Sequence, residues 1–250
     1  MARGRLIDRI VESGFLVSAL VSILSVVLIT IFIVIEGIPL FFRSNTGFPP
    51  PSVAEFLFGT EWYATDQPPA YGILPFILGS LLVTAGALVL AVPTGVATGI
   101  FIAEIAQGRS QRVLRRATEI LVGIPSVVYG FVGVMMIGFF LRNMDDPLVN
   151  YNAFSASVVL AVMTLPTIIN VTEVSIRSVP RSYADGSLAL GSTHWQTIWR
   201  VLLPAARSGV ITGVILGMMR AIGETMAVLM VAGNQPTIPT EGMRSRVRTL

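Results

Sequence analysis

Residues 67–103 read QPPAYGILPFILGSLLVTAGALVLAVPTGVATGIFIA and contain no Asp, Glu, Lys or Arg. A helix needs roughly 20 apolar residues to cross the hydrocarbon core of a bilayer, so this run is long enough for one span. Further charge-free runs occupy 13–35, 120–141 and 147–172, and between 208 and 240 only Arg220 and Glu224 carry charge. Runs of this length favour membrane-spanning helices over the alternating ten-residue strands of an outer-membrane barrel.

The composition of the whole chain agrees with a membrane protein. Of its 250 residues, 53% are hydrophobic and only 12% are charged, whereas a soluble domain is about 25% charged. This balance excludes a soluble enzyme, a nucleic-acid-binding domain and a disordered tail. The chain has no Cys and one His, so we expect neither disulfides nor a protein-held metal.

The charge-free runs predict an all-α integral membrane protein with five spans at about 14–40, 72–106, 118–141, 153–176 and 205–232. Placing the N-terminus in the cytoplasm leaves eleven arginines inside and five outside, as the positive-inside rule requires. The predicted organisation is then an N-terminal segment with the first span (1–42), an extracytoplasmic loop (43–71), a core of four spans (72–232) containing a cytoplasmic segment (180–203), and an extracytoplasmic segment (233–250).

Two of the predicted spans carry small residues at every fourth position, which places them on one helix face. Such faces let membrane helices approach closely, so we expect both spans to lie in the interior of the bundle. The residues are Ala87, Ala91, Gly95, Gly99 and Ala103 in the second span, and Gly209, Gly213, Gly217 and Ala221 in the fifth. Each of three prolines, Pro93, Pro125 and Pro166, removes one helical hydrogen bond, and both a structural kink and a functional break remain open for them.

Arg220 and Glu224 are the sharpest feature, because a charge near the centre of a span costs roughly 2.5–3.5 kcal/mol on insertion scales. Their i, i+4 spacing in a continuous helix predicts an ion pair on the face that also carries Gly213 and Gly217. A guanidinium suits oxyanions because it stays charged and offers two parallel hydrogen bonds. A static pair that only fixes helix packing is the alternative. The four glutamates at span ends, where headgroups solvate them, are interpreted as boundary residues: Glu36, Glu104, Glu119 and Glu173.

The cytoplasmic segment between the fourth and fifth spans carries Asp185-Gly186-Ser187, then Gly191, and, after nine intervening residues, Val201-Leu202-Leu203-Pro204. This spacing resembles the Glu-Ala-Ala loop of type I ABC importer permeases, with the acid kept at Asp185 and the two alanines replaced. We expect two short helices around Gly191, with Trp195, Ile198 and Trp199 on one face. The resemblance implies that Asp185, Gly191, Trp195, Leu203 and Pro204 couple the chain to an ATPase; a membrane-surface helix is the alternative.

Two further stretches are similar to signatures of phosphate-uptake permeases, and the second favours the C-type subunit. They are Gly123-Ile124-Pro125-Ser126-Val127-Val128-Tyr129-Gly130 and Arg220-Ala221-Ile222-Gly223-Glu224-Thr225-Met226-Ala227-Val228. The resemblance implies a type I ABC importer permease fold and a phosphate pathway through Arg220, Glu224 and Thr225. It also implies a cell-membrane heterodimer with a second permease subunit, two cytoplasmic ATPase subunits that bind ATP and Mg²⁺, and an extracytoplasmic phosphate-binding protein.

Several alternatives stay open on the sequence. A permease of the same architecture for molybdate or sulfate fits the motifs, and so does a membrane scaffold or sensor that transports nothing. The chain has no Lys and hence no Gly-Lys-Ser/Thr phosphate loop, so we expect no enzyme activity and no cofactor in this chain itself. Five spans would leave Arg244, Arg246 and Arg248 outside, so we also expect a sixth span to be missing after Leu250.

Overall fold

The computed structural model describes residues 2–42, 48–140 and 151–250, with side chains described within 11–42, 48–136 and 151–250. The chain divides into two compact units, Met1–Gly72 and Ile73–Leu250. Three of the described helices are long and apolar enough to cross a membrane, and two bent helix pairs raise this number to five if each pair is one span. The predicted all-α membrane architecture is therefore confirmed.

The first unit contains the N-terminal span and a small helix and hairpin. Its elements are α1 (Ala2–Gly37), α2 (Pro39–Phe42), α3 (Val53–Phe58), β1 (Trp62–Tyr63) and β2 (Ala70–Tyr71). The apolar segment of α1 and α2, Val11–Phe42, has no residue buried within the described structure. The short helix α3 is capped by Ser52, whose hydroxyl accepts a hydrogen bond from the amide of Glu55 at 3.1 Å. In the antiparallel hairpin Trp62 pairs with Tyr71.

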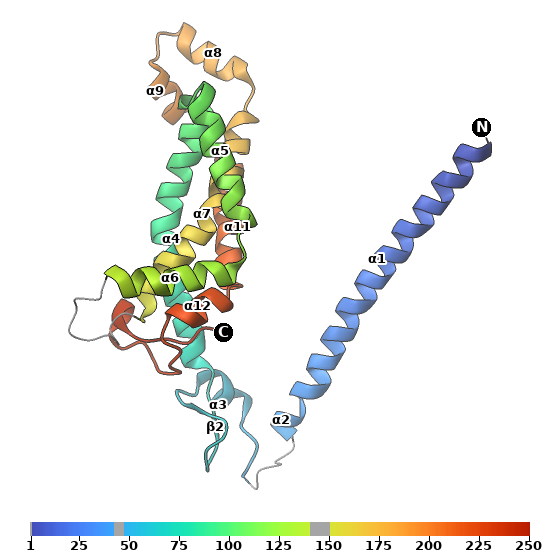
Figure 1. Cartoon of the computed structure of the whole chain (residues 1–250), viewed down its shortest axis with the longest axis vertical. Helices are drawn as coiled ribbons and strands as arrows, with labels where there is room; N and C mark the ends of the chain where they lie inside the picture. Colours follow the sequence, from blue (N-terminus) through green and yellow to red (C-terminus); the bar gives the residue numbers. More distant parts are fainter. Residues whose placement is uncertain (1, 43–47, 141–150) are drawn as a thin grey trace. The chain divides into compact units, whose positions relative to one another are not determined.

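Three long helices of the second unit pack side by side and form its core (Figure 1). They are α4 (Leu74–Ile100), continued by the π-turn η1 (Phe101–Ile105), α7 (Ala153–Arg177) and α11 (Arg207–Ile222). Ile168 of α7 is completely buried and lies against Gly95 of α4 and Gly217 of α11. A Cβ atom at Gly95 would stand 2.9 Å from Ile168 Cγ2, and one at Gly217 would stand 2.7 Å from Cγ1. Gly99 likewise faces Thr172, and Gly213 faces Val171.

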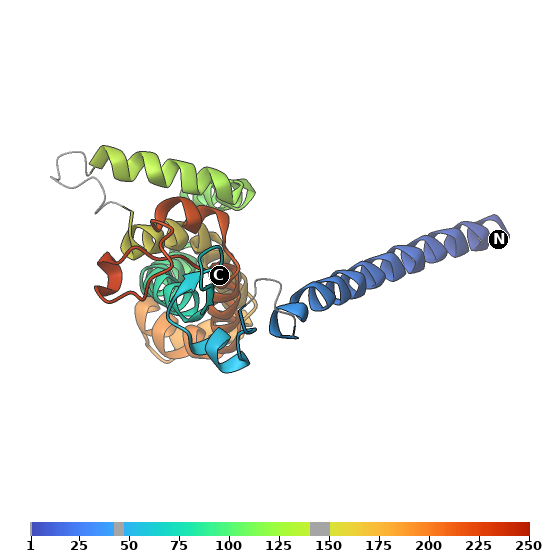
Figure 2. The same ribbon diagram turned by 90° about the horizontal axis from the view of Figure 1, so that it is seen from below.

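The predicted third span, 118–141, is not one straight helix. The structure has α5 (Gly108–Gly123) and α6 (Ser126–Phe140), with a bend of 101° between α5 and the part of α6 up to Met136. Ile124 is extended (φ −75°, ψ 126°), as expected for a residue that precedes a proline, and Pro125 cannot continue the hydrogen-bond ladder. Figure 2 shows α6 lying across one side of the bundle. By contrast, α4 and α7 continue as helices through Pro93, which is exposed, and Pro166, which is buried.

The predicted fifth span, 205–232, is also interrupted. Helix α11 ends at Ile222 and α12 (Met226–Val231) begins four residues later, so Gly223, Glu224 and Thr225 separate two half-helices. The cause is local, because Gly223 ends α11 and the Glu224 side chain bonds to the first turn of α12. Arg220 and Glu224 therefore do not share one helical face, as a continuous span would require.

The two ends of the second unit are built differently (Figure 1). One end holds a helical hairpin made of α8 (Arg181–Ala189), α9 (His194–Thr197), the π-turn η3 (Ile198–Leu202) and α10 (Leu203–Ala205). The chain then bends by 71° into α11. The opposite end holds the segment 233–250, which contains the turn η4 (Gly242–Arg244) and then runs in extended form.

Candidate functional site

The interruption between α11 and α12 places two opposite charges at two helix ends. Arg220 lies in the last turn of α11, where a cation is favoured by the helix dipole. The Glu224 carboxylate accepts a hydrogen bond of 3.0 Å from the amide of Ala227, in the first turn of α12, where an anion is favoured. Each charge therefore complements its own half-helix, which is a physical reason for both to be present at a break without pairing.

The predicted ion pair between Arg220 and Glu224 does not form among the residues that the structure describes, whereas Glu173 pairs with two arginines. The Nε atom of Arg220 is buried and has no hydrogen-bond partner among the residues described. Its guanidinium is close enough to the Tyr129 hydroxyl to act on it electrostatically. Thr225, the third residue expected in the pathway, is exposed at the break. The Arg220 guanidinium therefore has an N–H group that can still donate a hydrogen bond, where we expected Glu224 to accept it.

The two signature stretches come together in space, although about ninety residues separate them in the chain. Helix α6, which begins just after Pro125, packs on α12: a Cβ atom at Gly130 would stand 2.9 Å from the Cα atom of Ala227. Gly130 thus allows the two backbones to approach closely. The Tyr129 hydroxyl donates a 2.7 Å hydrogen bond to the carbonyl of Leu121, near the end of α5, and so links α5 and α6 across their break.

A buried carboxylate joins three elements on the α8 side of this break. Glu173 of α7 is 3% exposed and is paired with Arg115 of α5 and with Arg177, whose Nε lies 2.9 Å from the carboxylate. Arg177 also donates to the carbonyl of Ile102 in η1 at 3.2 Å, and Gln111 of α5 donates to the same carbonyl at 2.9 Å. The pair with Glu173 raises the pKa of Arg115 above its usual value.

Glu173 is therefore not the boundary residue that its place near a span end indicated. Two features of the sequence indicated this group of one glutamate and two arginines: the i, i+4 spacing of Glu173 and Arg177, and the arginine-rich segment 109–116. Neither signal reveals that α5 folds back along α7, which is what buries the carboxylate. Of the other three glutamates, Glu36 and Glu119 are exposed and Glu104 is half-buried.

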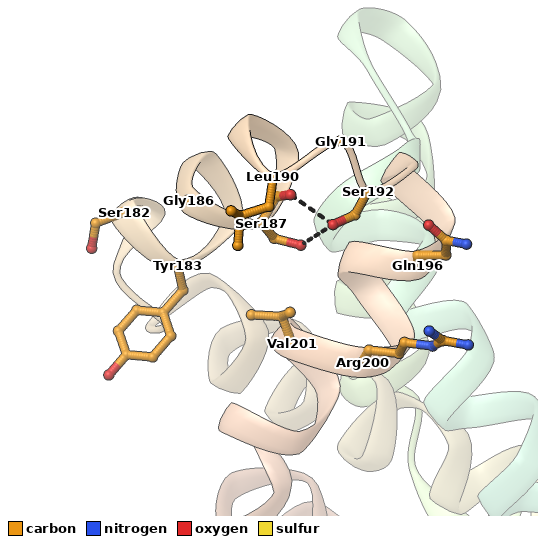
Figure 3. Close-up of a pocket in the computed structure, with 10 residues that line it drawn as sticks. All are labelled: Ser182, Tyr183, Gly186, Ser187, Leu190, Gly191, Ser192, Gln196, Arg200 and Val201. Atoms are coloured by element: carbon orange, nitrogen blue, oxygen red, sulfur yellow. Dashed lines mark hydrogen bonds between the residues drawn. The ribbon is translucent and has the colours of Figure 1, made fainter.

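A groove of about 790 Å³ that is open to solvent lies along the helical hairpin at the α8 end (Figure 3). The two predicted short helices are present, and Gly191 between them has φ +85°, a conformation that costs any residue with a Cβ atom. The hairpin is held by hydroxyl groups. Ser192 donates to the carbonyl of Ser187 at 2.6 Å, and the Ser187 hydroxyl also contacts those of Ser192 at 2.8 Å and Thr197 at 3.0 Å.

Apolar side chains on this hairpin face outward. Leu190 is 90% exposed, and the rings of Trp195 and Trp199 pack edge-on with centroids 5.7 Å apart while remaining about half exposed. The expectation that Ile198 shares this face is wrong: Ile198 is 1% exposed and packs with Ile100, Ile176 and Leu202. The reason is that α9 widens into the π-turn η3 at this residue, which changes the helical register.

The remaining residues expected to couple to an ATPase occupy different places on the hairpin. Asp185 is exposed on α8, Leu203 is half-buried at the start of α10, and the adjacent Pro204 is exposed. No three of His, Asp and Glu cluster closely enough to hold a metal ion in the part of the chain that the structure describes.

Comparisons with known proteins place these features in a family. Residues 95–248 match the family model described as "Binding-protein-dependent transport system inner membrane component". The chain belongs to this family of transport permeases. The match contains both signature stretches and the helical hairpin, and it agrees with the expected type I ABC importer permease class and its location in a membrane.

Several individual permeases are similar to this chain in sequence. A probable ABC transporter permease of Bacillus subtilis, YqgH, is 43% identical over 221 residues, which cover 88% of this chain and 70% of that protein. The phosphate transport system permease protein PstC of Xylella fastidiosa (strain 9a5c) is 33% identical over 75% of this chain and 64% of its own length. PstC 1 of Mycobacterium tuberculosis is 38% identical over 65% of this chain and 54% of its own length.

The chain thus spans between 54% and 70% of the length of these relatives. Among solved structures, an inward-facing form of the MetNI methionine ABC transporter matches with a TM-score of 0.48 and 19% identity. The match covers 64% of this chain and 70% of that one.

Proposed function

We propose that this chain is a transmembrane permease subunit of an ATP-driven importer of inorganic phosphate. The observation that carries the proposal is the guanidinium of Arg220, held at the break of a membrane helix with its Nε atom unpaired among the described residues. Transporters place substrate sites at such breaks, where half-helix ends face a cavity instead of lipid. The relatives named PstC favour phosphate as the anion.

In this proposal Arg220 compensates the charge of phosphate as it passes the break, and Glu224 keeps α12 in place by capping its first turn. Tyr129 and Gly130 hold α6 against α12, so that the two signature stretches form one wall of the pathway. A single guanidinium binds an oxyanion through charge-assisted hydrogen bonds without enclosing it, which allows release on the other side.

The membrane potential explains why such a subunit needs ATP. Moving one charge across the membrane costs about 2.3 kcal/mol per 100 mV, so a phosphate dianion entering against about 150 mV costs roughly 7 kcal/mol before any concentration gradient. We place the N-terminus and the α8–α9 hairpin in the cytoplasm, where two separate ATPase subunits dock on Leu190, Trp195 and Trp199. A second permease subunit completes the pathway, and an extracytoplasmic phosphate-binding protein delivers the anion.

The test is uptake of radiolabelled phosphate by membrane vesicles that contain the assembled complex, with and without ATP. Accumulation that requires ATP and that unlabelled phosphate abolishes supports the proposal. Accumulation of labelled sulfate or molybdate instead of phosphate would assign the permease to another oxyanion. If no oxyanion is accumulated although the ATPase co-purifies, the chain is a membrane scaffold and the proposal fails.

A further inference from the structure

Helix α5 is attached to the bundle in a different way from the three core helices. The core helices lock sterically, because Ile168 of α7 fills the space that Gly95 and Gly217 leave open. Among the sixteen residues of α5, all of which the structure describes, Thr118 alone is buried. Figure 1 shows α5 running from the α8 end of the bundle to α6. Helix α5 therefore lies along α7 as a strap on the outside of the core.

Polar contacts hold this strap to α7 and η1. The Arg115 guanidinium pairs with the Glu173 carboxylate, and the Thr118 hydroxyl lies 3.3 Å from the side-chain oxygen of Asn170. The side chain of Gln111 donates a 2.9 Å hydrogen bond to a backbone carbonyl of η1. We call these three contacts the polar seam. Water can replace hydrogen bonds and ion pairs of this kind at little net cost, so the seam can open while the sterically locked core stays closed.

The Glu173 carboxylate keeps a partner when the strap leaves it. Glu173 is 3% exposed, and a buried carboxylate that loses its only cation is strongly destabilising. Arg177, four residues further along the same helix, bonds to the same carboxylate oxygen as Arg115, and its Nε lies 2.9 Å away. The carboxylate can therefore pass from two arginines to one, as a reversible latch requires.

Both ends of the strap have the backbone freedom of a hinge. At its start, Gly108 has φ +58°, and a Cβ atom there would meet nothing within 4 Å. At its end the chain turns by 101° into α6 through Ile124 and Pro125, and Gly123 also has open space around it. A cavity of about 530 Å³, lined by Gly108 and Arg177 among others, lies beside the first hinge. The strap thus has two pivots and free space next to one of them.

The strap connects the α8–α9 hairpin to the break that holds Arg220. Arg177 is the last residue of α7, and α8 begins four residues later, at Arg181. At the other end of the strap, the carbonyl of Leu121 accepts a hydrogen bond from Tyr129 of α6, and α6 packs on α12 beside the break. A displacement at the hairpin therefore reaches the wall of the pathway through one helix and its two hinges.

We propose that α5 is a latched strap that transmits movement of the hairpin to the Arg220 break, with Glu173 as the positioning residue that latches it. When the ATPase subunits move the hairpin, Arg115 leaves Glu173, and α5 turns about its two hinges and moves α6 relative to the core. This proposal rests on the proposed function, because it needs ATPase subunits that act on the hairpin. Glu173 does not touch the anion, so it sets the coupling of ATP hydrolysis to uptake and not the affinity for phosphate.

The test measures distances between spin labels in the assembled complex by pulsed electron resonance, with partner subunits free of reactive Cys. The chain has no Cys of its own, so each label needs one substitution. The reporter pair is Ile120→Cys on the strap with Val174→Cys on α7, and the control pair is Val89→Cys on α4 with Val174→Cys. These three side chains are 68%, 66% and 72% exposed, so the labels leave the packing intact. Each pair is measured without nucleotide and with a hydrolysis-resistant ATP analogue.

We expect the analogue to lengthen the reporter distance by about 3 Å or more, because an open seam admits at least one layer of water. The control distance should not change, since α4 and α7 are locked sterically. This measurement leaves Glu173 in place, so it decides the proposal even where a variant at that position fails to assemble.

Variants at Glu173 test the latch itself. In Glu173→Gln the neutral amide holds Arg115 weakly, so the reporter distance should be long already without nucleotide. The amount of phosphate taken up per ATP hydrolysed should fall about tenfold, with the KM for phosphate-loaded binding protein unchanged. Glu173→Asp keeps the charge and should restore part of the coupling. Glu119→Gln removes an exposed carboxylate from the same strap and should behave like wild type.

Three results would overturn the latched strap and leave the proposed function intact. The first is a reporter distance that the ATP analogue leaves unchanged in a complex that accumulates phosphate. The second is equal lengthening of the reporter and control distances, which would show that the core itself deforms. The third is a Glu173→Gln complex that takes up as much phosphate per ATP as wild type. Conversely, a reporter distance that responds to the analogue in a complex that accumulates no oxyanion would support the strap and contradict the proposed function.

Discussion

Replacing Gly217 with Ala tests how tightly the three core helices are packed. A Cβ atom at this position would stand 2.7 Å from Ile168 Cγ1 and 2.9 Å from Cδ1. Ile168 has little room to move away, because its Cγ2 atom faces Gly95 of α4 so closely that a Cβ atom there would stand 2.9 Å from it. Overpacking of this kind costs about 1–3 kcal/mol, against which a helical Gly→Ala exchange gains about 0.5–1 kcal/mol. We therefore expect the free energy of unfolding to fall by about 1–2 kcal/mol.

The measurement is unfolding of the purified chain in mixed detergent micelles, followed by circular dichroism. Gly186 provides a matched control, because it lies in α8 and a Cβ atom there meets nothing within 4 Å; Gly186→Ala should not destabilise. In an Ile168→Ala background the clash is gone, so Gly217→Ala should become neutral or favourable, a coupling of about 1–2 kcal/mol. Equal costs of Gly217→Ala in the two backgrounds would refute the packing described here.

The remaining predictions concern the ion-pair cluster and the hairpin. Glu173→Gln removes the carboxylate shared by two arginines that are 47% and 37% exposed, so we expect a loss of about 1–2 kcal/mol in the same unfolding assay, allowing for solvent screening. A double-mutant cycle with Arg115→Gln should show coupling, and strictly additive losses would contradict the pair. Gly191→Ala forces a Cβ atom into the left-handed region at φ +85° and should cost about 1 kcal/mol, with Gly191→Asn costing less. Equal stability of Gly191→Ala and wild type would show that the hairpin turn adopts another conformation.

Hydropathy and charge were sufficient to predict the long helices. The second and fourth predicted spans, 72–106 and 153–176, agree closely with Leu74–Ile105 and Ala153–Arg177. These helices could be read from local sequence because each is one apolar run limited by polar residues. The spacing of the glycines also indicated which helix faces pack together, because glycine allows two helix backbones to approach closely.

Hydropathy and charge did not predict where the helices break. Pro93, Pro125 and Pro166 are alike in the sequence, yet only at Pro125 does the helix stop, where the chain turns so that α6 can pack on α12. Whether a proline bends or ends a helix depends on what the neighbouring elements supply, which is tertiary information. The break after Ile222 has a weaker signal in the sequence than a proline, namely Gly223, which ends α11. Because the residues on both sides are apolar, the stretch resembles one continuous span.

For the candidate site, the sequence named candidate residues but predicted the wrong geometry for two of them. The motif identified Arg220 and Glu224, but the assumption of a continuous helix paired them with each other. In the structure each charge serves its own helix end, and the carboxylate that does pair with arginine is Glu173. An i, i+4 rule holds only inside one helix, so a break of three residues is enough to overturn it.

The central claim is that Arg220 acts on an oxyanion at the break of the fifth span. The most direct measurement is ATP-dependent uptake of radiolabelled phosphate by vesicles that contain the complex with Arg220→Gln, alongside Arg109→Gln as an exposed control. Loss of charge-assisted hydrogen bonds worth about 1.5–3 kcal/mol predicts a ten- to hundredfold fall in uptake for Arg220→Gln, with the ATPase still bound, and none for the control. Uptake by the Arg220→Gln complex at the wild-type rate would contradict the claim.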